Sequence, residues 1–421
     1  MRHGTRLAVC AIVLGLAWPV AAVDVVIAPD GMLEIDGQRT FIIGLYENPK
    51  DDEVLEEAAQ AGFNLVRGSA DAAALDRLHA QGLYAWVNTG GRIDLGEDGS
   101  KPDTGLREMI EAVGAHPALL VWEVPDEALW GCWLKAYRQP LPMGEQTRMF
   151  RERAAARGAG LVAGYKALKQ LDPKRPIWMN HAAGNSIAQL AAFGKAADLV
   201  GCDIYPLMPY PTRPIDVSRS LLAAVGVATT HMQDTAPGKP VWMVLQGAGW
   251  VDFNGLFGKK NPDGQQPTFH ESRFMAYDAI VRGARAVLYW GTHYVEKDTP
   301  FWQDLIKVVR DLAAHQSLLS APDAGLLPEV RTRIGWMPFG VKDAPIGVRA
   351  LGKDVDGQVW WLVVNEYPFP VTCMLSGLAD SEGTTYTDTT ANTQAIVEDG
   401  KLTLPLPRYG VHILRPPAPK E

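Results

Sequence analysis

Short apolar runs alternate with helix-like segments along most of this chain. Each run is rich in β-branched and aromatic residues, and the segments between them, such as DEVLEEAAQAG and ESRFMAYDAIVRGAR, place apolar residues at helical spacing. Eight strand-helix alternations predict a closed parallel barrel wrapped by helices. The eight runs are residues 41–46, 63–68, 84–88, 119–124, 176–180, 199–205, 240–246 and 286–291.

The pattern therefore predicts an α/β protein with a (β/α)8 TIM barrel over residues 23–322. An N-terminal β-hairpin around Asp36-Gly37 precedes the first barrel strand, because this dipeptide suits a tight turn. A doubly wound open sheet is the main alternative, but no glycine-rich phosphate loop follows the first strand. Residues 323–415 read as several short strands and predict a small all-β sandwich, and residues 416–421 as a tail.

The first 22 residues predict a secretory signal peptide. Two arginines precede an apolar stretch from Leu7 to Trp18, and Val20 and Ala22 stand at the positions favoured for cleavage. The stretch is too short to span a bilayer, so we expect a secreted or periplasmic protein without a transmembrane anchor. The sequence carries no signal for its oligomeric state.

Charge and cysteine content narrow the function further. Without the signal peptide the chain has 38 basic and 48 acidic residues, a formal net charge of −10. A nucleic-acid partner is unexpected, because no basic stripe is present to neutralise phosphates. Cys132, Cys202 and Cys373 lie far apart and give no disulfide framework, although one bridge is compatible with an oxidising compartment.

Polar and aromatic residues close every predicted barrel strand. Active sites of such barrels lie at these strand ends, so the residues predict a polar cup with aromatic walls. We expect Arg67 to be buried beneath this cup and paired with a rim carboxylate. The strand-end residues are Glu47, Asn48, Arg67, Asn88, Asp126, Glu127, Asn180, His181, Asp203, Tyr205, Gln246, Trp290 and His293.

The stretch WEVPDE, residues 122–127, resembles the clan A glycoside hydrolases. In that clan the fourth strand ends in an Asn-Glu pair after a tryptophan, and Glu127 matches the general acid/base while Asp126 replaces the Asn. Arg67 in FNLVR, Tyr205 in CDIYP and Trp290 in LYWG also resemble the clan, as does YGVHILRP of its C-terminal β-domain. The resemblance implies cleavage of O-glycosidic bonds in a poly- or oligosaccharide, without a cofactor.

Gln246 departs from the clan pattern, which places a nucleophilic Glu at the end of strand seven. An amide cannot form the glycosyl-enzyme ester, so two hydrolytic mechanisms stay open. In an inverting mechanism Asp203 or Glu47 would activate water opposite Glu127. In a substrate-assisted mechanism, as in the β-hexosaminidases of family 20 that the Asp-Glu pair resembles, Asp126 would steady a 2-acetamido group. Tyr205 or Gln246 would then bind the acetamido oxygen.

The sequence thus predicts Glu127, Asp126 and Asp203 as catalytic residues of a hydrolase. The predicted substrate-binding residues are Glu47, Arg67, Asn88, His181, Tyr205, Gln246, Trp250, Trp290 and His293. The alternative is a catalytically silent barrel that binds glycans by stacking on Trp130, Trp250, Trp290 and Trp302. A metal enzyme is the weakest hypothesis, because His181, Asp203 and His293 lack a ligand spacing such as HExxH. Specificity is expected to reside in two loops, residues 131–146 and 250–270.

Overall fold

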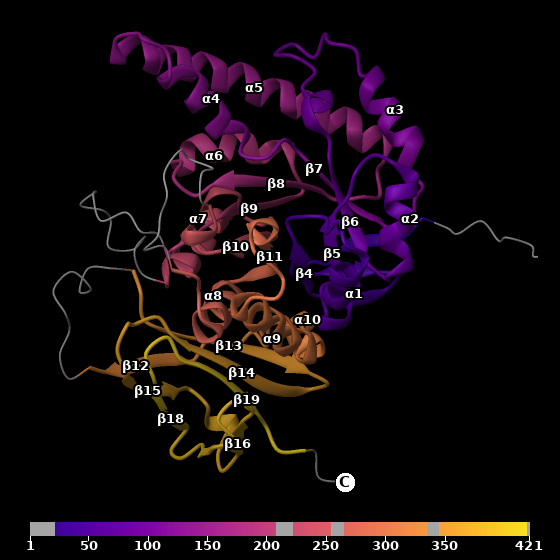
Figure 1. Ribbon diagram of the computed structural model, residues 1–421. Coiled ribbons are helices and arrows are strands. Elements are labelled where there is room, and N and C mark those ends of the chain that lie inside the picture. Colours follow the sequence, from indigo (N-terminus) through magenta and orange to yellow (C-terminus); the bar gives the residue numbers. More distant parts are fainter. Residues whose placement is uncertain (1–21, 208–221, 254–264, 335–344, 419–421) are drawn as a thin grey trace, which may run out of the picture.

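The computed structural model describes residues 22–207, 222–253, 265–334 and 345–418. Its centre is a closed barrel of eight parallel strands that follow one another around the barrel in chain order (Figure 1). Each strand overlaps the apolar run predicted for it, so the predicted barrel is confirmed. The strands are β4 (Ile42–Leu45), β5 (Leu65–Arg67), β6 (Tyr84–Asn88), β7 (Leu119–Glu123), β8 (Ile177–Ala182), β9 (Leu199–Asp203), β10 (Val241–Gln246) and β11 (Ala284–Trp290).

Large aromatic rings fill the interior of the barrel. Every second side chain of a strand points inward, and three of these are the buried indoles of Trp86, Trp178 and Trp242. The ring centroids of Trp86 and Trp178 lie 5.8 Å apart, and those of Trp178 and Trp242 lie 5.6 Å apart. Gly201 makes room for them, because a Cβ there would lie 1.6 Å from the Trp242 carbonyl oxygen. This packed layer leaves the strand ends above it as the place for a site.

Helices form the outer layer, and several begin at side-chain caps. Asp51, Asp71, Thr268 and Thr299 each accept a hydrogen bond from a backbone N–H in the first turn of the helix that follows. The helices are α1 (Asp52–Ala61), α2 (Ala72–Ala80), α3 (Thr104–Val113), α4 (Ala128–Tyr137), α5 (Met143–Leu171), α6 (Ile187–Phe193), α7 (Ala224–Thr235), α8 (Phe269–Val281), α9 (Pro300–Ala314) and α10 (Gln316–Ser320).

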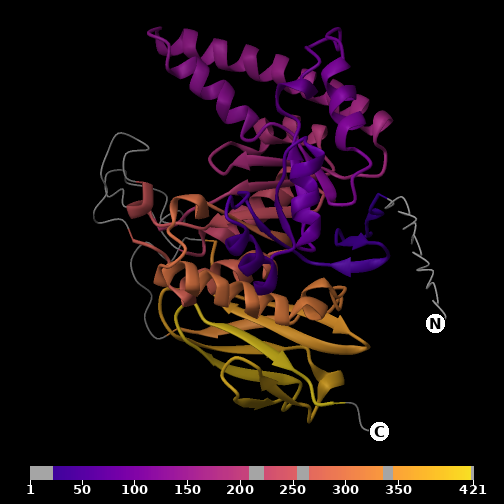
Figure 2. The same cartoon turned by 45° about the vertical axis from the view of Figure 1, so that its right-hand side comes forward.

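Helices α4 and α5 form a long hairpin between β7 and β8, on the side of the barrel away from the C-terminal domain (Figure 2). Helix α5 has 29 residues and is the longest helix that the structure describes. The expectation of a loop at residues 131–146 is therefore wrong, since most of this segment is the end of α4 and the start of α5. The second expected loop lies largely outside the described residues.

A small antiparallel sheet precedes the barrel. It consists of β1 (Val25–Ile27), β2 (Leu33–Ile35) and β3 (Gln38–Thr40), with β2 in the middle. The predicted turn joins β2 to β3, and both of its central residues, Asp36 and Gly37, have positive φ angles of 49° and 79°. Such angles at both positions suit the Asp-Gly sequence of a two-residue hairpin.

The C-terminal domain is the predicted β-sandwich. One sheet contains three strands in the order β12-β15-β18, and the other contains five in the order β13-β14-β19-β16-β17. Helices α8 and α9 lie between the barrel and this domain (Figure 1), and α8 packs against β14. The strands are β12 (Glu329–Arg333), β13 (Val348–Val355), β14 (Gln358–Asn365), β15 (Val371–Ser376), β16 (Thr385–Asp388), β17 (Gln394–Ile396), β18 (Lys401–Leu406) and β19 (Val411–Arg415).

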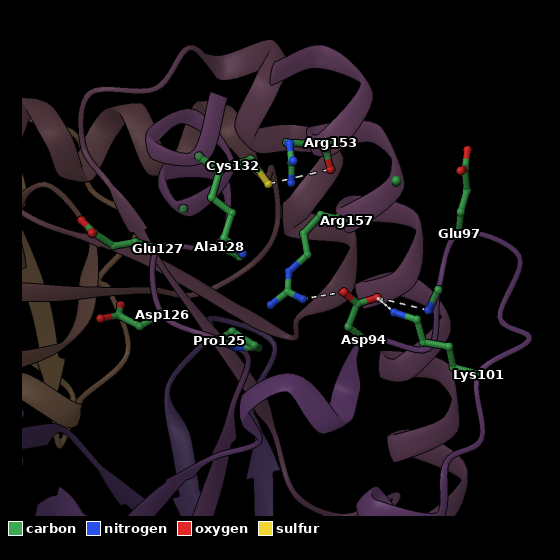
Figure 3. A pocket seen from close by; sticks show the side chains of 14 residues that line it. Asp94, Glu97, Lys101, Pro125, Asp126, Glu127, Ala128, Cys132, Arg153 and Arg157 are labelled. Carbon is green, nitrogen blue, oxygen red and sulfur yellow. Dashed lines mark hydrogen bonds and ion pairs between the residues drawn. The ribbon is translucent and has the colours of Figure 1, made fainter. Parts of the chain in front are cut away.

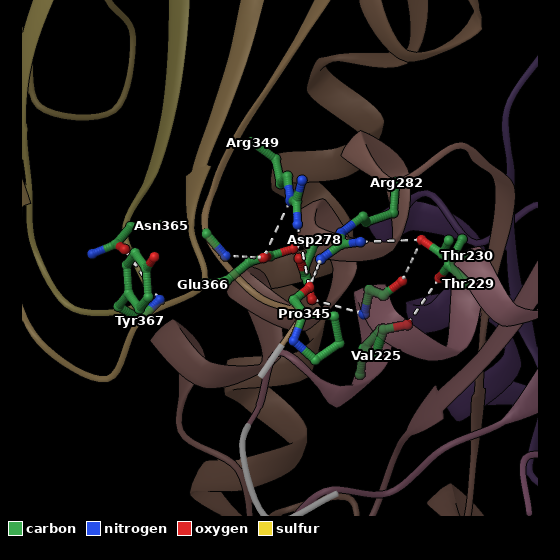
Figure 4. Close-up of polar contacts among 12 residues, drawn as sticks. Val225, Thr229, Thr230, Asp278, Arg282, Pro345, Arg349, Asn365, Glu366 and Tyr367 are labelled. Atoms are coloured by element: carbon green, nitrogen blue, oxygen red, sulfur yellow. Dashed lines mark hydrogen bonds and ion pairs between the residues drawn. The ribbon is translucent and has the colours of Figure 1, made fainter. Parts of the chain in front are cut away.

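A buried polar cluster joins the two domains (Figure 4). The Glu366 carboxylate, next to the end of β14, accepts hydrogen bonds from Arg282 Nε at 2.6 Å and from Arg349 Nε at 3.3 Å. Asp278 of α8 lies beside it and accepts a hydrogen bond from the Gly226 N–H at 2.8 Å. Burial and the negative charge of Glu366 raise the pKa of Asp278 well above its usual range.

The three cysteines of the described part of the chain, Cys132, Cys202 and Cys373, are free and buried. No bridge joins them, so the disulfide that the sequence left open is not formed between these residues. Residues 1–21 and 419–421 lie outside the described residues, and with them most of the expected signal peptide and part of the expected tail. Among the described helices, none is both long and apolar enough to cross a membrane.

Candidate active site

Polar and aromatic side chains gather at the carboxyl ends of the barrel strands, above the tryptophan layer. Every strand contributes at least one of them, either from its last inward-facing position or from the residues that follow it. We call this group the cup. Its residues are Tyr46, Arg67, Asn88, Glu123, Asp126, Glu127, Asn180, Asp203, Tyr205, Gln246 and Trp290.

Glu123, the last residue of β7, is a fully buried carboxyl group in the cup. The Tyr46 hydroxyl donates a hydrogen bond to its Oε1 atom, and Asn88 Nδ2 donates to its Oε2 atom at 2.5 Å. Burial and the nearby Asp126 carboxylate raise the pKa of Glu123 well above its usual range. Sequence reasoning missed Glu123 and Tyr46 because both stand inside apolar runs. The alternation of side chains along a strand could have identified Glu123, because Val121 faces the barrel interior and the residue two positions further on shares its face.

A sharp turn between β7 and α4 carries Asp126 and Glu127. Glu127 has a φ angle of 45° and immediately precedes α4, and a non-glycine residue in this conformation costs about 1–3 kcal/mol. Asn180 holds the turn from β8, because its Nδ2 donates to Asp126 Oδ1 at 2.9 Å and its carbonyl oxygen accepts from the Glu127 N–H at 3.2 Å. Figure 3 shows that the two carboxyl groups point to the same side of the turn.

The charges of the cup keep protons on its acids near neutral pH. Burial and the negative charge of Asp126 raise the pKa of Glu127 to about 7. Asp203, at the end of β9, has its own pKa raised well above its usual range by burial and by the negative charge of Glu127. Ionisation of Glu127 therefore disfavours ionisation of Asp203.

Asp126 is open to solvent at the mouth of the cup, whereas Glu127 and Asp203 are partly buried. The Asp126 carboxyl group is nevertheless turned partly into the cup, where burial raises its pKa and the hydrogen bond from Asn180 opposes that shift. The Oδ1 atom of Asn180 is buried and has no hydrogen-bond partner among the described residues. This oxygen could accept a hydrogen bond from a ligand hydroxyl.

Arg67 does not take the buried position expected for it. It is exposed, and its guanidinium lies 5.6 Å from the centroid of the Trp86 ring. No ion pair of 4 Å or less joins it to a carboxylate in the part of the chain that the structure describes. Its positive charge nevertheless lowers the pKa values of Glu123 and Asp126, against the larger effect of their burial. The strand is short and ends at Arg67, so its side chain reaches the open rim.

The Gln246 side chain links the segments that follow β9 and β10, because its amide group forms hydrogen bonds with the main chain of both. Its Oε1 atom accepts from the Leu207 N–H at 3.1 Å, while its Nε2 donates to the carbonyl oxygens of Leu207 at 3.3 Å and Ala248 at 3.0 Å. The residue is 2% exposed. Its expected contact with substrate would require breaking these bonds.

An aromatic wall lines the β9 to β11 side of the cup. The rings of Tyr205 and Trp290 stack with centroids 5.1 Å apart, and Phe253 stacks on Trp290 at 5.4 Å. Trp250 packs edge-on against Phe253 and is 7% exposed, so little of its ring is open for the sugar stacking expected of it. His293 is exposed, with its ring 6.2 Å from that of Trp290.

Two further predicted ligand-binding residues are engaged elsewhere. Glu47 is buried and accepts a hydrogen bond from Lys297 Nζ at 3.0 Å. His181 lies outside the cup, because the alternation along β8 puts it on the outer face with Met179 whereas Asn180 shares the inner face with Trp178. Its ring is buried, which lowers its pKa to about 4. Within the described ranges no three His, Cys, Asp or Glu side chains are grouped as metal ligands.

Comparison with known proteins rests on structure. No family model and no curated protein sequence matches the chain. A β-galactosidase from Bacillus circulans sp. alkalophilus is 10% identical, with a TM-score of 0.57 over 90% of this chain and 99% of that one. A family 5 glycoside hydrolase from Bacteroides vulgatus is 11% identical, with a TM-score of 0.57 over 93% and 92% of the two chains.

A third solved structure is similar over nearly the same extent. The family 42 β-galactosidase Gan42B from G. stearothermophilus is 10% identical, with a TM-score of 0.55 over 90% of this chain and 98% of that one. The chain shares with these proteins the fold of an eight-stranded parallel barrel followed by a β-sandwich domain. A shared fold does not establish a shared activity, so the chemistry has to be argued from the cup.

Proposed function

We propose that this protein is a secreted or periplasmic glycoside hydrolase in which Glu127 is the general acid/base. The carbohydrate would bind in the cup, with its glycosidic oxygen beside Glu127. The observation that carries this proposal is a carboxyl group with a pKa of about 7 on a strained turn at the mouth of a glycosidase fold. A catalytic acid works best when its pKa lies near the working pH, and positive φ angles at non-glycine residues cluster at functional sites.

The neighbours of Glu127 favour catalysis assisted by the substrate. An inverting mechanism needs a second carboxylate that is ionised and can activate water. Burial and the charge of Glu127 raise the pKa of Asp203 well above its usual range, which disfavours the ionised form that a general base needs. Glu47 is neutralised by Lys297. Asp203 therefore fits a role as proton partner of Glu127 better than the expected role of general base.

Asp126 is then the acid left to act on the substrate itself. In the proposed reaction the Glu127 carboxyl group gives its proton to the glycosidic oxygen as the bond to the anomeric carbon breaks. The carbonyl oxygen of a 2-acetamido group on the same sugar attacks that carbon, and the Asp126 carboxylate accepts the acetamido N–H. Water then loses a proton to Glu127 and opens the cyclic intermediate, so the product keeps the anomeric configuration. Tyr205 stands at the wall where the acetamido oxygen would lie.

The alternative of a silent glycan-binding barrel receives less support. Trp302 is fully buried and its ring lies 4.3 Å from Lys297 Nζ, and Trp250 is nearly buried. Two of the four tryptophans expected to stack on sugars thus have little ring surface to offer. A binding protein also has no use for a protonated Glu127 on a strained turn.

The test is hydrolysis of aryl and alkyl 2-acetamido glycosides by wild type, Glu127→Gln and Asp126→Asn. Glu127→Gln should lower kcat/KM about 10²-fold or more for poor leaving groups and less for good ones. The active form is protonated at Glu127, so wild-type kcat/KM should fall as pH rises through about 7. Glu145→Gln, an exposed carboxylate of α5, is the matched control. Undiminished hydrolysis by Glu127→Gln would contradict the role of Glu127 as general acid/base. Product inversion detected by NMR would contradict the substrate-assisted mechanism.

A further inference from the structure

A pocket of about 500 Å³ lies behind the turn that carries Glu127 (Figure 3). Residues of α4, of α5 and of the segment after β6 line it, together with residues 125–128 of the turn that also carries the Asp126 and Glu127 carboxyl groups of the cup. Six of its lining residues bear on its chemistry. They are Asp94, Lys101, Cys132, Lys135, Arg153 and Arg157.

Four cations and four acids line this pocket, and two of the acids, Asp126 and Glu127, belong to the turn whose carboxyl groups point away from Arg153 and Arg157 (Figure 3). Apart from the acids of the shared turn, four cations face two acids, Asp94 and Glu97. Arg157 donates to Asp94 at 2.5 Å, and Lys101 Nζ lies 3.7 Å from the same carboxylate. Lys135 and Arg153 form no ion pair within the described residues. Lys135, Arg153 and Arg157 line the pocket together with Cys132, whose thiol pKa is raised by burial against the effect of these three charges.

The main charge acting on Glu127 is that of Asp126, and the cation acting on Asp126 is Arg67, which lies outside this pocket. Figure 3 shows the carboxyl groups of Asp126 and Glu127 pointing away from Arg153 and Arg157. The surplus positive charge therefore faces the pocket and its contents.

Two glycines of α5 give the pocket a fixed shape. A Cβ at Gly160 would lie 2.1 Å from Asp94 Oδ1, and a Cβ at Gly164 would lie 1.7 Å from the Ile93 carbonyl oxygen. The Leu95 N–H donates to the Gly160 carbonyl oxygen at 3.2 Å. Glycine weakens the interior of a helix, so its presence at both positions is explained by this close approach of the loop. Asp94 is thereby fixed beside Arg157.

We propose that this pocket binds the carboxylate or sulfate group of a glycan residue adjacent to the sugar held in the cup, on its leaving-group side. The substrate class is then an acidic glycan. A planar carboxylate or a sulfate offers acceptors that match arginine donors. The glycosidic oxygen protonated by Glu127 leads to the next residue, which crosses the shared turn into the pocket. The inference rests on the proposed function for the placement of that oxygen.

Binding measured without turnover tests the pocket. In the Glu127→Gln background, isothermal titration calorimetry compares unsulfated chondroitin tetrasaccharide with its carboxyl-reduced form, and 6-O-sulfated N-acetylchitotetraose with unsulfated N-acetylchitotetraose. The first pair isolates a carboxylate and the second a sulfate. The pocket variant is Lys135→Gln with Arg153→Gln, and the matched control is Arg138→Gln with Arg151→Gln, two exposed arginines of the same hairpin that do not line the pocket. All four changes keep good helix-forming residues.

We expect at least one anionic probe to bind about tenfold or more tightly than its neutral partner, an advantage that shrinks at high salt. The pocket variant should lose this advantage and the control should keep it. Equal affinities within both pairs, or the same loss in the control, would overturn the inference. If wild type hydrolyses neither neutral probe nor acidic probe while the anion preference persists, the proposed function fails and the anion site stands. If neutral glycans are hydrolysed and no anion preference is found, the anion site fails and the proposed function stands.

Discussion

Replacing Gln246 by Glu would supply the carboxylate that retaining members of clan A carry at the end of strand seven. The structure predicts that Gln246→Glu destabilises the protein and creates no new activity. The Gln246 Nε2 atom donates to the carbonyl oxygens of Leu207 at 3.3 Å and Ala248 at 3.0 Å. A carboxylate oxygen in its place would face both carbonyl oxygens without a proton to share.

The cost follows from these contacts. Two lost hydrogen bonds of about 1 kcal/mol each, together with the buried carbonyl groups left without a donor, give about 2–4 kcal/mol. Taking up a proton lets the new carboxyl group satisfy one carbonyl, and its pKa in the folded protein is then raised above the unfolded value of about 4.3. The penalty is therefore small below about pH 4 and grows by about 1.4 kcal/mol for each pH unit until the pH passes the folded-state pKa.

Urea unfolding at several pH values between 4 and 8 would measure this cost, with Gln394→Glu as the control for a new charge at an exposed position. We expect Gln246→Glu to approach wild-type stability at low pH and to lose about 2–4 kcal/mol of unfolding free energy near pH 7.5. The product configuration from aryl hexosides, followed by NMR, checks the activity. Wild-type stability at every pH, or a retaining hexosidase activity found in the variant alone, would refute the reasoning.

Two further predictions concern the buried acids Asp278 and Glu123 and are tested by urea unfolding. Because the pKa of Asp278 is raised in the fold, its contribution to stability is fully present below its unfolded pKa of about 4 and is lost as pH rises through the folded value. Asp278→Asn keeps an acceptor for the Gly226 N–H, so it should flatten the decline of the urea midpoint above pH 4, and an unchanged slope would contradict this. Tyr46→Phe removes a donor to Glu123 and should cost about 1–3 kcal/mol in urea unfolding, whereas Tyr84→Phe should cost less; equal costs would count against the assigned bond.

The barrel could be predicted from the sequence because each of its strands is a short apolar run between turn signals. The α4–α5 hairpin could not. A barrel needs one helix after each strand, and the hairpin places two there. Helix α5 buries only a narrow set of positions, among them Phe150, Leu161 and Leu168, while three further buried positions are glycines. Such a helix shows little apolar periodicity, and its glycines read as breakers until their contacts with the loop after β6 are known.

The residues at strand ends were predictable, and their directions were not. Successive side chains of a barrel strand point alternately to the barrel interior and to the surrounding helices. An error of one residue in the predicted register therefore assigns a side chain to the wrong face. Asn180 and His181 illustrate this, because the first holds Asp126 and the second is buried outside the cup. Gln246 faces the cup, yet its bonds to Leu207 and Ala248 depend on the path of neighbouring loops. No pattern in the sequence specifies those paths.

The acidic residues of the cup favour a nucleophile supplied by the substrate over one supplied by the protein. Glu123, Asp126, Glu127 and Asp203 converge on one partly dry space, and each has a raised pKa. Burial and the neighbouring like charges both disfavour ionisation of these acids, so the cup retains protons near neutral pH. A site of this kind is well suited to give a proton to a leaving group and poorly suited to keep a second free carboxylate for attack on the anomeric carbon. A group supplied by the substrate avoids that conflict, because an acetamido oxygen attacks without adding a negative charge to the cup.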